Sequence, residues 1–221
     1  MELIPRLQKL VDTLNGLFES EGKKDEQQKL SIAGEALKML VATDDWLPEE
    51  FAQSHPQYYQ QYLLYCDPQQ RFSIVSFVWG PGQTTPIHDH KVWALIGMLR
   101  GAERSERFVV ASQAQPMKCI SRDILFQGEI ESLSPSLGDI HRVSNAYANR
   151  LSISIHIYGG NIGQIKRHIY DQATGNMSEF ISEYSNIPCN SGSCFPTSSA
   201  CISGNPCPRY LKFCFRAIAH D

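Results

Sequence analysis

The chain has 221 residues, of which 42% are hydrophobic and 19% charged, and its formal net charge is -3. This length and composition are typical of one main globular domain with an appendage. The slightly negative charge offers no basic surface, so we expect no nucleic-acid partner. No run of eighteen apolar residues occurs, and the N-terminus lacks a basic segment followed by an apolar one. We therefore expect a cytoplasmic protein with no membrane partner.

Residues 1–68 have the pattern of a helical segment. Apolar residues recur at helical spacing from Leu3 to Phe18 and again from Leu30 to Val41, which predicts two amphipathic helices. The stretch WLPEEFAQSH predicts a short third helix, because Pro48 would lie in its first turn and the acidic residues that follow suit the helix dipole.

From residue 70 the pattern changes to short β-rich runs separated by turn residues. The runs are FSIVSFVW, VWALIGMLRG, ERFVVA, DILFQGEIESL, IHRVSN and LSISIHIYG. Their spacing is typical of a small barrel or sandwich. We therefore predict a mainly β fold, with a barrel over residues 69–186 and the helices of residues 1–68 packed on its outside.

One run, SISIHIY at residues 152–158, alternates cleanly. In a strand, Ser154, His156 and Tyr158 would share one face, and the three isoleucines between and before them would share the other. An inward polar face would suit a strand that lines a functional cavity. The alternative is a strand whose polar face simply meets water.

The cysteines are unevenly distributed: only Cys66 and Cys119 precede residue 189, and the other five fall in the last 33 residues. A disulfide framework would need an oxidising compartment, and the missing signal sequence argues against one. The C-terminal tail contains no Cys-x-x-Cys pair, which argues against a zinc site there. We expect residues 187–221 to be a loosely ordered tail with free thiols.

The stretch PGQTTPIHDHKVW, residues 81–93, contains two histidines with one residue between them. On a strand, His88 and His90 point to the same side and can offer two nitrogens to one metal ion, although two ligands alone do not hold it. Imidazole suits iron, zinc, copper and nickel. His55 and His220 fit no ligand pattern, and His168 is intermediate.

Two segments resemble the paired motifs of the cupin superfamily. Residues 82–101 have the spacing of the first motif, except that Ala94 stands where a glutamate ligand often sits, and residues 138–145 have the spacing of the second. This resemblance implies a small antiparallel β-barrel, the cupin double-stranded β-helix, in which the two motifs face each other. The implied metal ligands are His88, His90 and His141.

Within the cupins, three runs together resemble the cysteine dioxygenase type I family of thiol dioxygenases. They are FVWGPGQTTPIHDHKVWALIGMLRGA, GDIHRVSN and SISIHIYGGNIG. The resemblance in the order and residue pattern of the segments covers roughly residues 1 to 185. It implies mononuclear Fe(II) bound by three histidines, which accounts for Ala94 in place of a glutamate. It also implies that Ser154, His156 and Tyr158 form a hydrogen-bonded catalytic set that ends at the iron.

The implied reaction is the Fe(II)-dependent addition of both atoms of O2 to the sulfur of a small thiol carboxylate, which gives a sulfinic acid. The partners would then be the thiol and O2, and we expect a monomer or a weak homo-oligomer. Two other functions stay open: another cupin metalloenzyme, such as an isomerase or a different oxygenase, and a non-catalytic cupin that senses a small ligand. The first leaves the Ser-His-Tyr set without an evident task, and the intact three-histidine set argues against the second.

The resemblance also separates subgroups of the family. Mammalian-type members carry a cysteine cross-linked to the active-site tyrosine, and Ala94 stands at that position here, so no thioether is expected at Tyr158. They also bind the substrate carboxylate through an arginine that is replaced here by Gln61. This pattern resembles a bacterial Gln-type subgroup similar to 3-mercaptopropionate dioxygenases, which implies that Arg167 binds the carboxylate. An arginine fork suits this role better than Lys166 would.

Two points about the substrate remain open at this stage. Arg167 could instead be a solvated or salt-bridged surface residue. The thiol could be 3-mercaptopropionate or L-cysteine, and the sequence favours the former, because Gln61 and Arg167 provide one carboxylate clamp. No residue at the matched positions provides an anion for an α-amino group, and a buried unpaired ammonium is costly.

Overall fold

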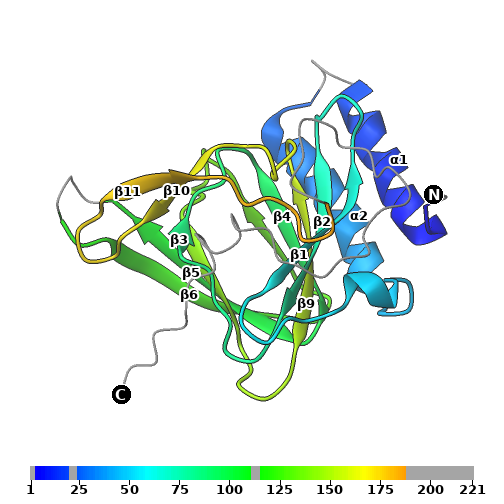
Figure 1. Ribbon diagram of the computed structural model, residues 1–221. Helices are drawn as coiled ribbons and strands as arrows, with labels where there is room; N and C mark the ends of the chain where they lie inside the picture. The colour runs from blue at the N-terminus through cyan, green and yellow to red at the C-terminus, as the bar shows by residue number, and fades with distance from the viewer. Residues whose placement is uncertain (1–2, 20–23, 111–114, 188–221) are drawn as a thin grey trace.

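The computed structural model describes residues 3–19, 24–110 and 115–187. In this part of the chain, a β-barrel carries a layer of two helices on one side (Figure 1). The cysteine-rich tail expected from the sequence lies, from residue 188 onward, outside the described residues. No helix in the described part is both long and apolar enough to cross a membrane.

The two amphipathic helices predicted from the apolar spacing are confirmed. They are α1 (Pro5–Glu19) and α2 (Glu26–Val41). α2 begins at a capping box, in which the Asp25 carboxylate accepts the Gln28 N–H and the Gln28 side chain accepts the Asp25 N–H. Such a box satisfies two backbone donors that the first helical turn leaves unpaired.

The prediction of a third helix in the stretch WLPEEFAQSH is wrong in the length and type of the helix. Only a three-residue 3₁₀ turn, η1 (Glu49–Phe51), forms there, and Pro48 precedes it in extended backbone instead of lying in its first turn. Proline has a fixed φ that suits either position, so the pattern alone did not separate a helix from a single turn.

The first sheet has five strands in the order β1-β2-β9-β4-β7, and all neighbouring pairs are antiparallel. The strands are β1 (Gln60–Cys66), β2 (Ser73–Trp79), β9 (Ser152–Tyr158), β4 (Ala94–Arg100) and β7 (Ile130–Leu133). β9 lies in the middle of this sheet, between β2 and β4. Its side chains therefore reach both faces without exposure at an edge.

The second sheet has six strands in the order β11-β10-β3-β8-β5-β6. The strands are β11 (Met177–Phe180), β10 (Arg167–Tyr170), β3 (Ile87–His88), β8 (His141–Asn145), β5 (Ala102–Val109) and β6 (Lys118–Phe126). The two sheets face each other around one apolar cluster to which both contribute (Figure 1). The predicted mainly β fold with helices outside it is thus confirmed.

Each of the six β-rich runs contains a strand, but four of the described strands lie outside these runs: β1, β3, β10 and β11. The expected barrel boundary at residue 69 falls after β1, which pairs with β2 along its length. The run DILFQGEIESL forms two strands, because Gly128 adopts a φ of 83° in the turn between β6 and β7. This left-handed backbone favours glycine.

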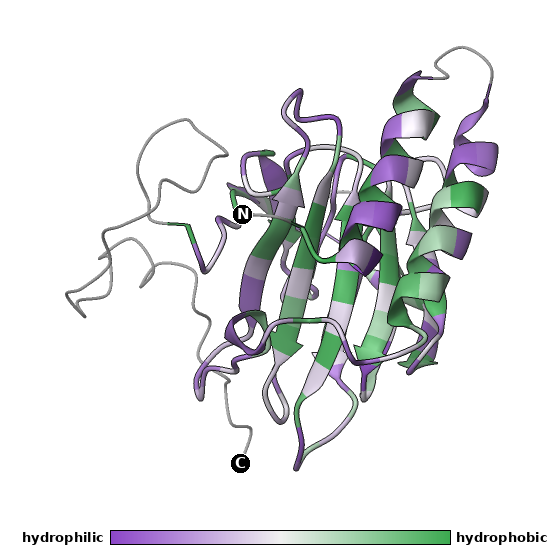
Figure 2. Cartoon of the chain, turned by 90° about the vertical axis from the view of Figure 1, so that its right-hand side faces the viewer, coloured by the Kyte–Doolittle hydropathy of each residue, from purple (hydrophilic) through white to green (hydrophobic). Residues whose placement is uncertain are grey.

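The helices cover the outer face of the five-stranded sheet, as Figure 2 shows. Buried leucines of both helices pack there on the isoleucines of β9. Burying each such side chain contributes about 1.5–3 kcal/mol. Gly97 on β4 allows this contact, since a Cβ at that position would lie 2.9 Å from Leu37 Cγ in α2.

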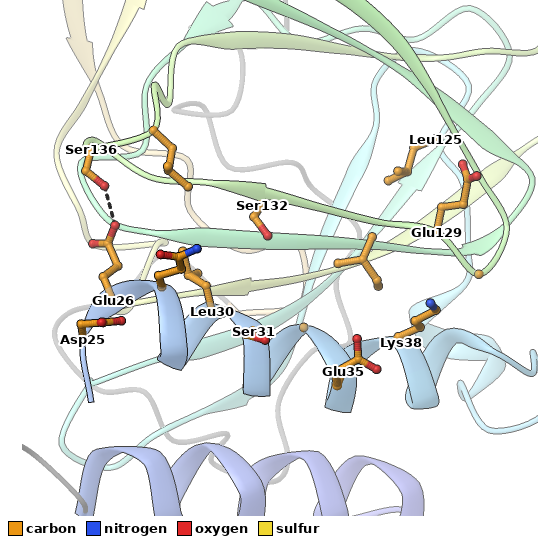
Figure 3. A pocket seen from close by; sticks show the side chains of 15 residues that line it. Asp25, Glu26, Leu30, Ser31, Glu35, Lys38, Leu125, Glu129, Ser132 and Ser136 are labelled. Atoms are coloured by element: carbon orange, nitrogen blue, oxygen red, sulfur yellow. Dashed lines mark hydrogen bonds between the residues drawn. The ribbon is translucent and has the colours of Figure 1, made fainter. Parts of the chain in front are cut away.

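A groove of ≈ 960 Å³ lies between α2 and the strands β6 and β7 (Figure 3). At one end, Glu26 accepts hydrogen bonds from the hydroxyls of Ser134 and Ser136 at 2.9 and 2.6 Å, which ties α2 to the loop after β7. None of the candidate site residues from the sequence lines this groove. They lie in the barrel interior instead.

Candidate metal centre

The barrel brings three histidines of the two sequence motifs together. His88 ends β3 and lies directly opposite His141, the first residue of β8, while His90 follows two residues after His88. One ring nitrogen from each histidine lies within 4.8 Å of those of the other two. All three side chains are buried. This spacing allows a single ion to contact all three.

The three histidines are electrically neutral near pH 7. Burial, followed by the Arg167 guanidinium, lowers the pKa of His88 to about 4. Burial, and then repulsion from the neighbouring histidines, holds the pKa of His90 and of His141 well below the usual value. Neutral imidazole is the form that donates a lone pair to a metal.

The ring nitrogens of this set lack sufficient protein partners. His88 Nδ1 lies 3.0 Å from the Pro86 carbonyl and donates to it, which leaves its Nε2 with a lone pair. Nδ1 of His90 and Nδ1 of His141 are buried and have no hydrogen-bond partner among the described residues. Unpaired buried polar atoms are costly. The donor set therefore fits a metal ion, which would supply interactions that the protein does not.

Asp89 lies between the two motif histidines and anchors their loop to β10. Its carboxylate accepts hydrogen bonds from His168 Nδ1 and the Tyr170 hydroxyl, both at 2.9 Å, and Lys91 Nζ lies at the same distance. Burial alone would raise the pKa of Asp89, but these donors and the His168 backbone N–H lower it below the usual value. His168 thus binds Asp89 and is not part of the metal set.

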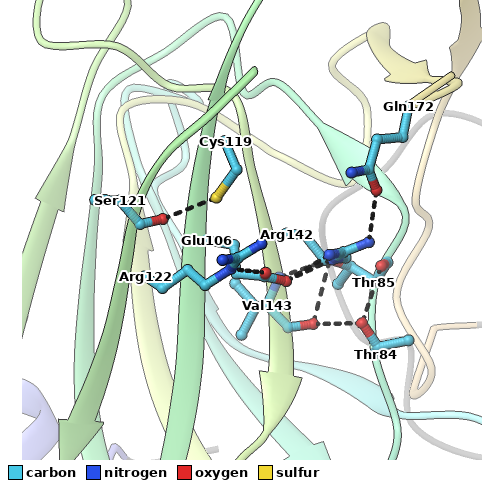
Figure 4. Close-up of polar contacts among 9 residues, drawn as sticks. All are labelled: Thr84, Thr85, Glu106, Cys119, Ser121, Arg122, Arg142, Val143 and Gln172. Atoms are coloured by element: carbon cyan, nitrogen blue, oxygen red, sulfur yellow. Dashed lines mark hydrogen bonds and ion pairs between the residues drawn. The ribbon is translucent and has the colours of Figure 1, made fainter. Parts of the chain in front are cut away.

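On β8, the residue after His141 faces the opposite way. Arg142 and Arg122 donate to the two oxygens of Glu106 at 2.7 and 2.9 Å, and Arg142 also reaches Gln172 (Figure 4). These contacts join β5, β6 and β8 on the outer face. In the β5–β8 ladder, Arg142 lies opposite Glu106, and His141 lies opposite Arg107.

A line of hydrogen bonds leads along the inner face of β9. Ser154 Oγ lies 2.8 Å from His156 Nε2, and His156 Nδ1 lies 2.9 Å from the Tyr158 hydroxyl. Trp79 Nε1 on β2 donates to Ser154 Oγ at 3.1 Å. The Tyr158 ring stands 5.5 Å from that of His90, so the line ends beside the histidine set. We call these three residues of β9 the relay.

Burial keeps the relay neutral. It lowers the pKa of His156 to about 3, with a smaller contribution from His88, and it raises the pKa of Tyr158 above its usual value. His156 therefore carries one ring proton and Tyr158 keeps its hydroxyl proton near pH 7. The ring proton of His156 can sit on either ring nitrogen, and the Tyr158 proton can point toward the ring or away from it.

The structure places Ala94 directly opposite Tyr158 across the β4–β9 pair. Its methyl group cannot form a thioether. Of the two cysteines in the described part of the chain, Cys66 lies on β1, separated from β9 by β2, and Cys119 lies on β6 of the other sheet.

Arg167 is a buried cation without a carboxylate. Arg167 is only 4% exposed. Its Nη2 donates to the Ser182 hydroxyl, and its guanidinium lies 4.7 Å from the centre of the Phe180 ring. Among the described residues it forms no ion pair, and its Nε has no hydrogen-bond partner. Burial lowers its pKa. The surface-residue alternative therefore does not describe Arg167.

Gln61 on β1 meets Arg167 at the same serine. Gln61 Nε2 donates to the Ser182 carbonyl at 3.2 Å and to its hydroxyl at 3.1 Å. By contrast, Lys166 is exposed and pairs with Glu179 at 3.2 Å. Sequence reasoning missed Ser182, because a serine just after a short, unpredicted strand carries no signal of its own. It also missed Trp79, because all of β2 is buried and its largely apolar run does not mark one face as functional.

The fold and the three-histidine set define a cupin-type protein with a candidate metal site. The model of the family "Cysteine dioxygenase type I" matches residues 24–173. The chain belongs to this family, and the cupin fold that the two motifs imply is confirmed.

Curated relatives are distant. Cysteine dioxygenase type 1 of Danio rerio is 25% identical over 178 residues, which cover 77% of this chain and 81% of the relative. The protein of the same name from Bos taurus is 27% identical over 113 residues, which cover 50% of this chain and 55% of the relative. The chain thus spans about half the length of the bovine relative.

Solved structures with a similar fold include a protein with a double-stranded β-helix domain from Klebsiella pneumoniae. It is 15% identical, with a TM-score of 0.39, and the match covers 61% of this chain and 93% of that one. A cupin superfamily protein from Desulfitobacterium hafniense is 13% identical, with a TM-score of 0.38, and covers 49% of this chain and 84% of its own.

Proposed function

We propose that the protein is a thiol dioxygenase in which His88, His90 and His141 hold Fe(II). The single observation that carries this proposal is the meeting of three neutral, buried imidazoles with the hydroxyl end of the relay. Family membership supports the same reading. A cupin isomerase or a ligand sensor would leave the relay without a task.

The reaction converts a thiol and O2 into a sulfinic acid, so all atoms are retained. Sulfur loses four electrons, O2 accepts them, and no external reductant is needed. Bound Fe(II) would supply a Lewis acid for the thiolate and the redox partner for O2. A set of three nitrogen ligands, without a carboxylate, leaves room on the same ion for both substrates.

Arg167 would bind the carboxylate of the substrate. A buried guanidinium with no acidic partner gains two parallel charge-assisted hydrogen bonds when a carboxylate arrives. Gln61 would act through Ser182, since its amide nitrogen already donates to that residue. In this role Gln61 holds the Arg167 fork in place and contacts the substrate less directly than the sequence suggested.

Tyr158 would hold a hydrogen bond to the substrate or to oxygen. Its raised pKa keeps the hydroxyl protonated, so it can donate at the pH of the cell. His156 orients it through the hydrogen bond at Nδ1, and Ser154 holds the His156 ring in place through the hydrogen bond at Nε2.

The preferred thiol would be 3-mercaptopropionate, with L-cysteine as the poorer substrate. Arg167 offers one anion-binding fork, while the nearby carboxylate of Asp89 is already bound by His168, Tyr170 and Lys91. An α-amino group would thus enter a site without an acidic partner. The cost is on the order of a few kcal/mol, or roughly a hundredfold in kcat/KM.

A panel of thiols tests the proposal. The Fe(II)-loaded protein is given 3-mercaptopropionate, L-cysteine and cysteamine while O2 consumption is recorded. We expect the highest kcat/KM for 3-mercaptopropionate and the lowest for cysteamine, which has no carboxylate. A preference for cysteine would remove the substrate assignment alone. The absence of uptake with all three thiols would contradict the dioxygenase and favour a different cupin function.

A further inference from the structure

A buried acid lies at the end of the relay opposite to Tyr158. Glu103, the second residue of β5, has no exposed surface, and both of its carboxylate oxygens lack a hydrogen bond of standard geometry among the described residues. The polar groups that act on it are the Ser154 hydroxyl and the Trp79 indole N–H. No pattern in the sequence selects this glutamate, and the proposed reaction does not otherwise use it.

The surroundings of Glu103 favour its neutral form. Burial raises the pKa most, the nearby Glu131 carboxylate raises it further, and Ser154 and Trp79 lower it; the result is a pKa of about 8. Glu131 on β7 is itself paired with Arg107 at 2.9 Å. Tyr158, across the relay, also interacts with Glu103.

Hydrogen-bond counting gives one arrangement for the ionised carboxylate. The Ser154 hydroxyl has one proton and two lone pairs, and the Trp79 N–H already occupies one lone pair. A buried carboxylate needs a donor, and because the Trp79 N–H is directed at Ser154 at 3.1 Å, it is the Ser154 proton that turns toward Glu103. Ser154 must then accept from His156 Nε2–H. The bare Nδ1 of His156 in turn accepts the Tyr158 O–H, which points away from the histidine set.

The protonated carboxyl gives the opposite arrangement. Its O–H donates to Ser154, and together with the Trp79 N–H it fills both lone pairs. Ser154 must now donate to His156 Nε2, so the ring proton sits on Nδ1 and donates to the Tyr158 oxygen. The Tyr158 proton is then free to point into the cavity.

We propose that Glu103 is a positioning residue whose protonation sets the direction of the relay, and with it whether Tyr158 donates a hydrogen bond into the cavity. The protonated form is the one that supports the proposed reaction. The direction of the relay is a property of these side chains alone. Only its effect on rate rests on the proposed function.

The tautomer of His156 reports the direction. We would label the histidines of the full chain with ¹⁵N, load the site with diamagnetic Zn(II), which imidazole also binds, and assign His156 with a His156→Gln variant. We expect the ring proton on Nδ1 at low pH and on Nε2 at high pH, with a transition near pH 8. A tautomer that stays constant across this range would overturn the proposal.

Glu103→Gln supplies the second arm, because the amide does not titrate. Its His156 tautomer should be the same at every pH. Glu106→Gln is the matched control on the same strand: Glu106 binds Arg122 and Arg142 on the outer face, so this variant should keep the transition. An unchanged transition in Glu103→Gln would contradict the proposal, and if that variant does not fold, the wild-type titration decides.

Kinetics separate this inference from the proposed function. In the Fe(II)-loaded protein, kcat should fall as pH rises through about 8, and Glu103→Gln should abolish this step. A tautomer transition without thiol oxidation would support the role of Glu103 and remove the dioxygenase. A fall in kcat that persists unchanged in Glu103→Gln would assign the step to another group and overturn the role of Glu103.

Discussion

The two faces of β9 differ in what they contact, although every residue of the strand is buried. On the outer face, its isoleucines pack against the helices. On the inner face, Ser154, His156 and Tyr158 bond to one another and end beside the metal candidate. Burial alone therefore does not identify functional residues. The difference lies in whether the buried groups are apolar, and so contribute to stability, or polar and aligned with a site.

The largest expected effect is on the inner side. His141→Ala removes one of three nitrogens, so we expect loss of bound iron and of thiol oxidation, measured by metal analysis and O2 uptake. His55→Ala is the control, because His55 stacks on Tyr58 away from the set. Full iron content and activity in His141→Ala would rule out the assignment of the ligands.

A pair of substitutions separates the two faces directly. Tyr158→Phe removes only the hydroxyl and should lower kcat roughly a hundredfold, with iron content and thermal stability little changed. Ile155→Ala leaves a cavity under the helices and should cost about 2–5 kcal/mol in the free energy of unfolding, with kcat unchanged in the folded fraction. If both variants lost stability and neither lost rate, the faces would not differ as described.

A smaller effect is expected at the carboxylate clamp. Arg167→Ala should raise KM for 3-mercaptopropionate about 10- to 100-fold, because a charge-assisted hydrogen-bonded contact of about 1.5–3 kcal/mol is lost, while iron content stays the same. Lys166→Ala is the matched control, since Lys166 is next to Arg167 in the chain but is exposed and pairs with Glu179. Equal kinetics in the two variants would refute the clamp.

The smallest expected effect is the absence of a modification. Because Ala94 faces Tyr158, intact mass and peptide mapping should show one species with an unmodified tyrosine. A peptide in which Tyr158 is joined to Cys66 or Cys119, with two hydrogens fewer, would contradict this expectation.

Local patterns accounted for the parts of the site that depend on strand periodicity. The alternation of residues 152–158 placed the relay on one face, because side chains in a strand alternate by geometry alone. The spacing of His88 and His90 predicted one face for two ligands, but β3 ends at His88 and His90 lies in the loop after it, so the fold brings these two together. The third ligand followed from the motif spacing. These positions were therefore available from the sequence.

Other parts depend on contacts between distant segments, which no local pattern records. β10 and β11 are four residues each and exist by pairing with β3 and with one another. Ser182 gains its importance only where Gln61 and Arg167 meet. Glu103 resembles any glutamate in a charged run until β5 closes against β9 and buries it.

Isotope labelling of the product tests whether both oxygen atoms of O2 reach the sulfur of the thiol. The Fe(II)-loaded protein is incubated with 3-mercaptopropionate under ¹⁸O₂, and the product is measured by mass spectrometry. We expect a sulfinic acid in which both sulfinate oxygens carry the label. A disulfide, an unlabelled product, or a product with a single labelled oxygen would contradict the assignment of this protein as a thiol dioxygenase.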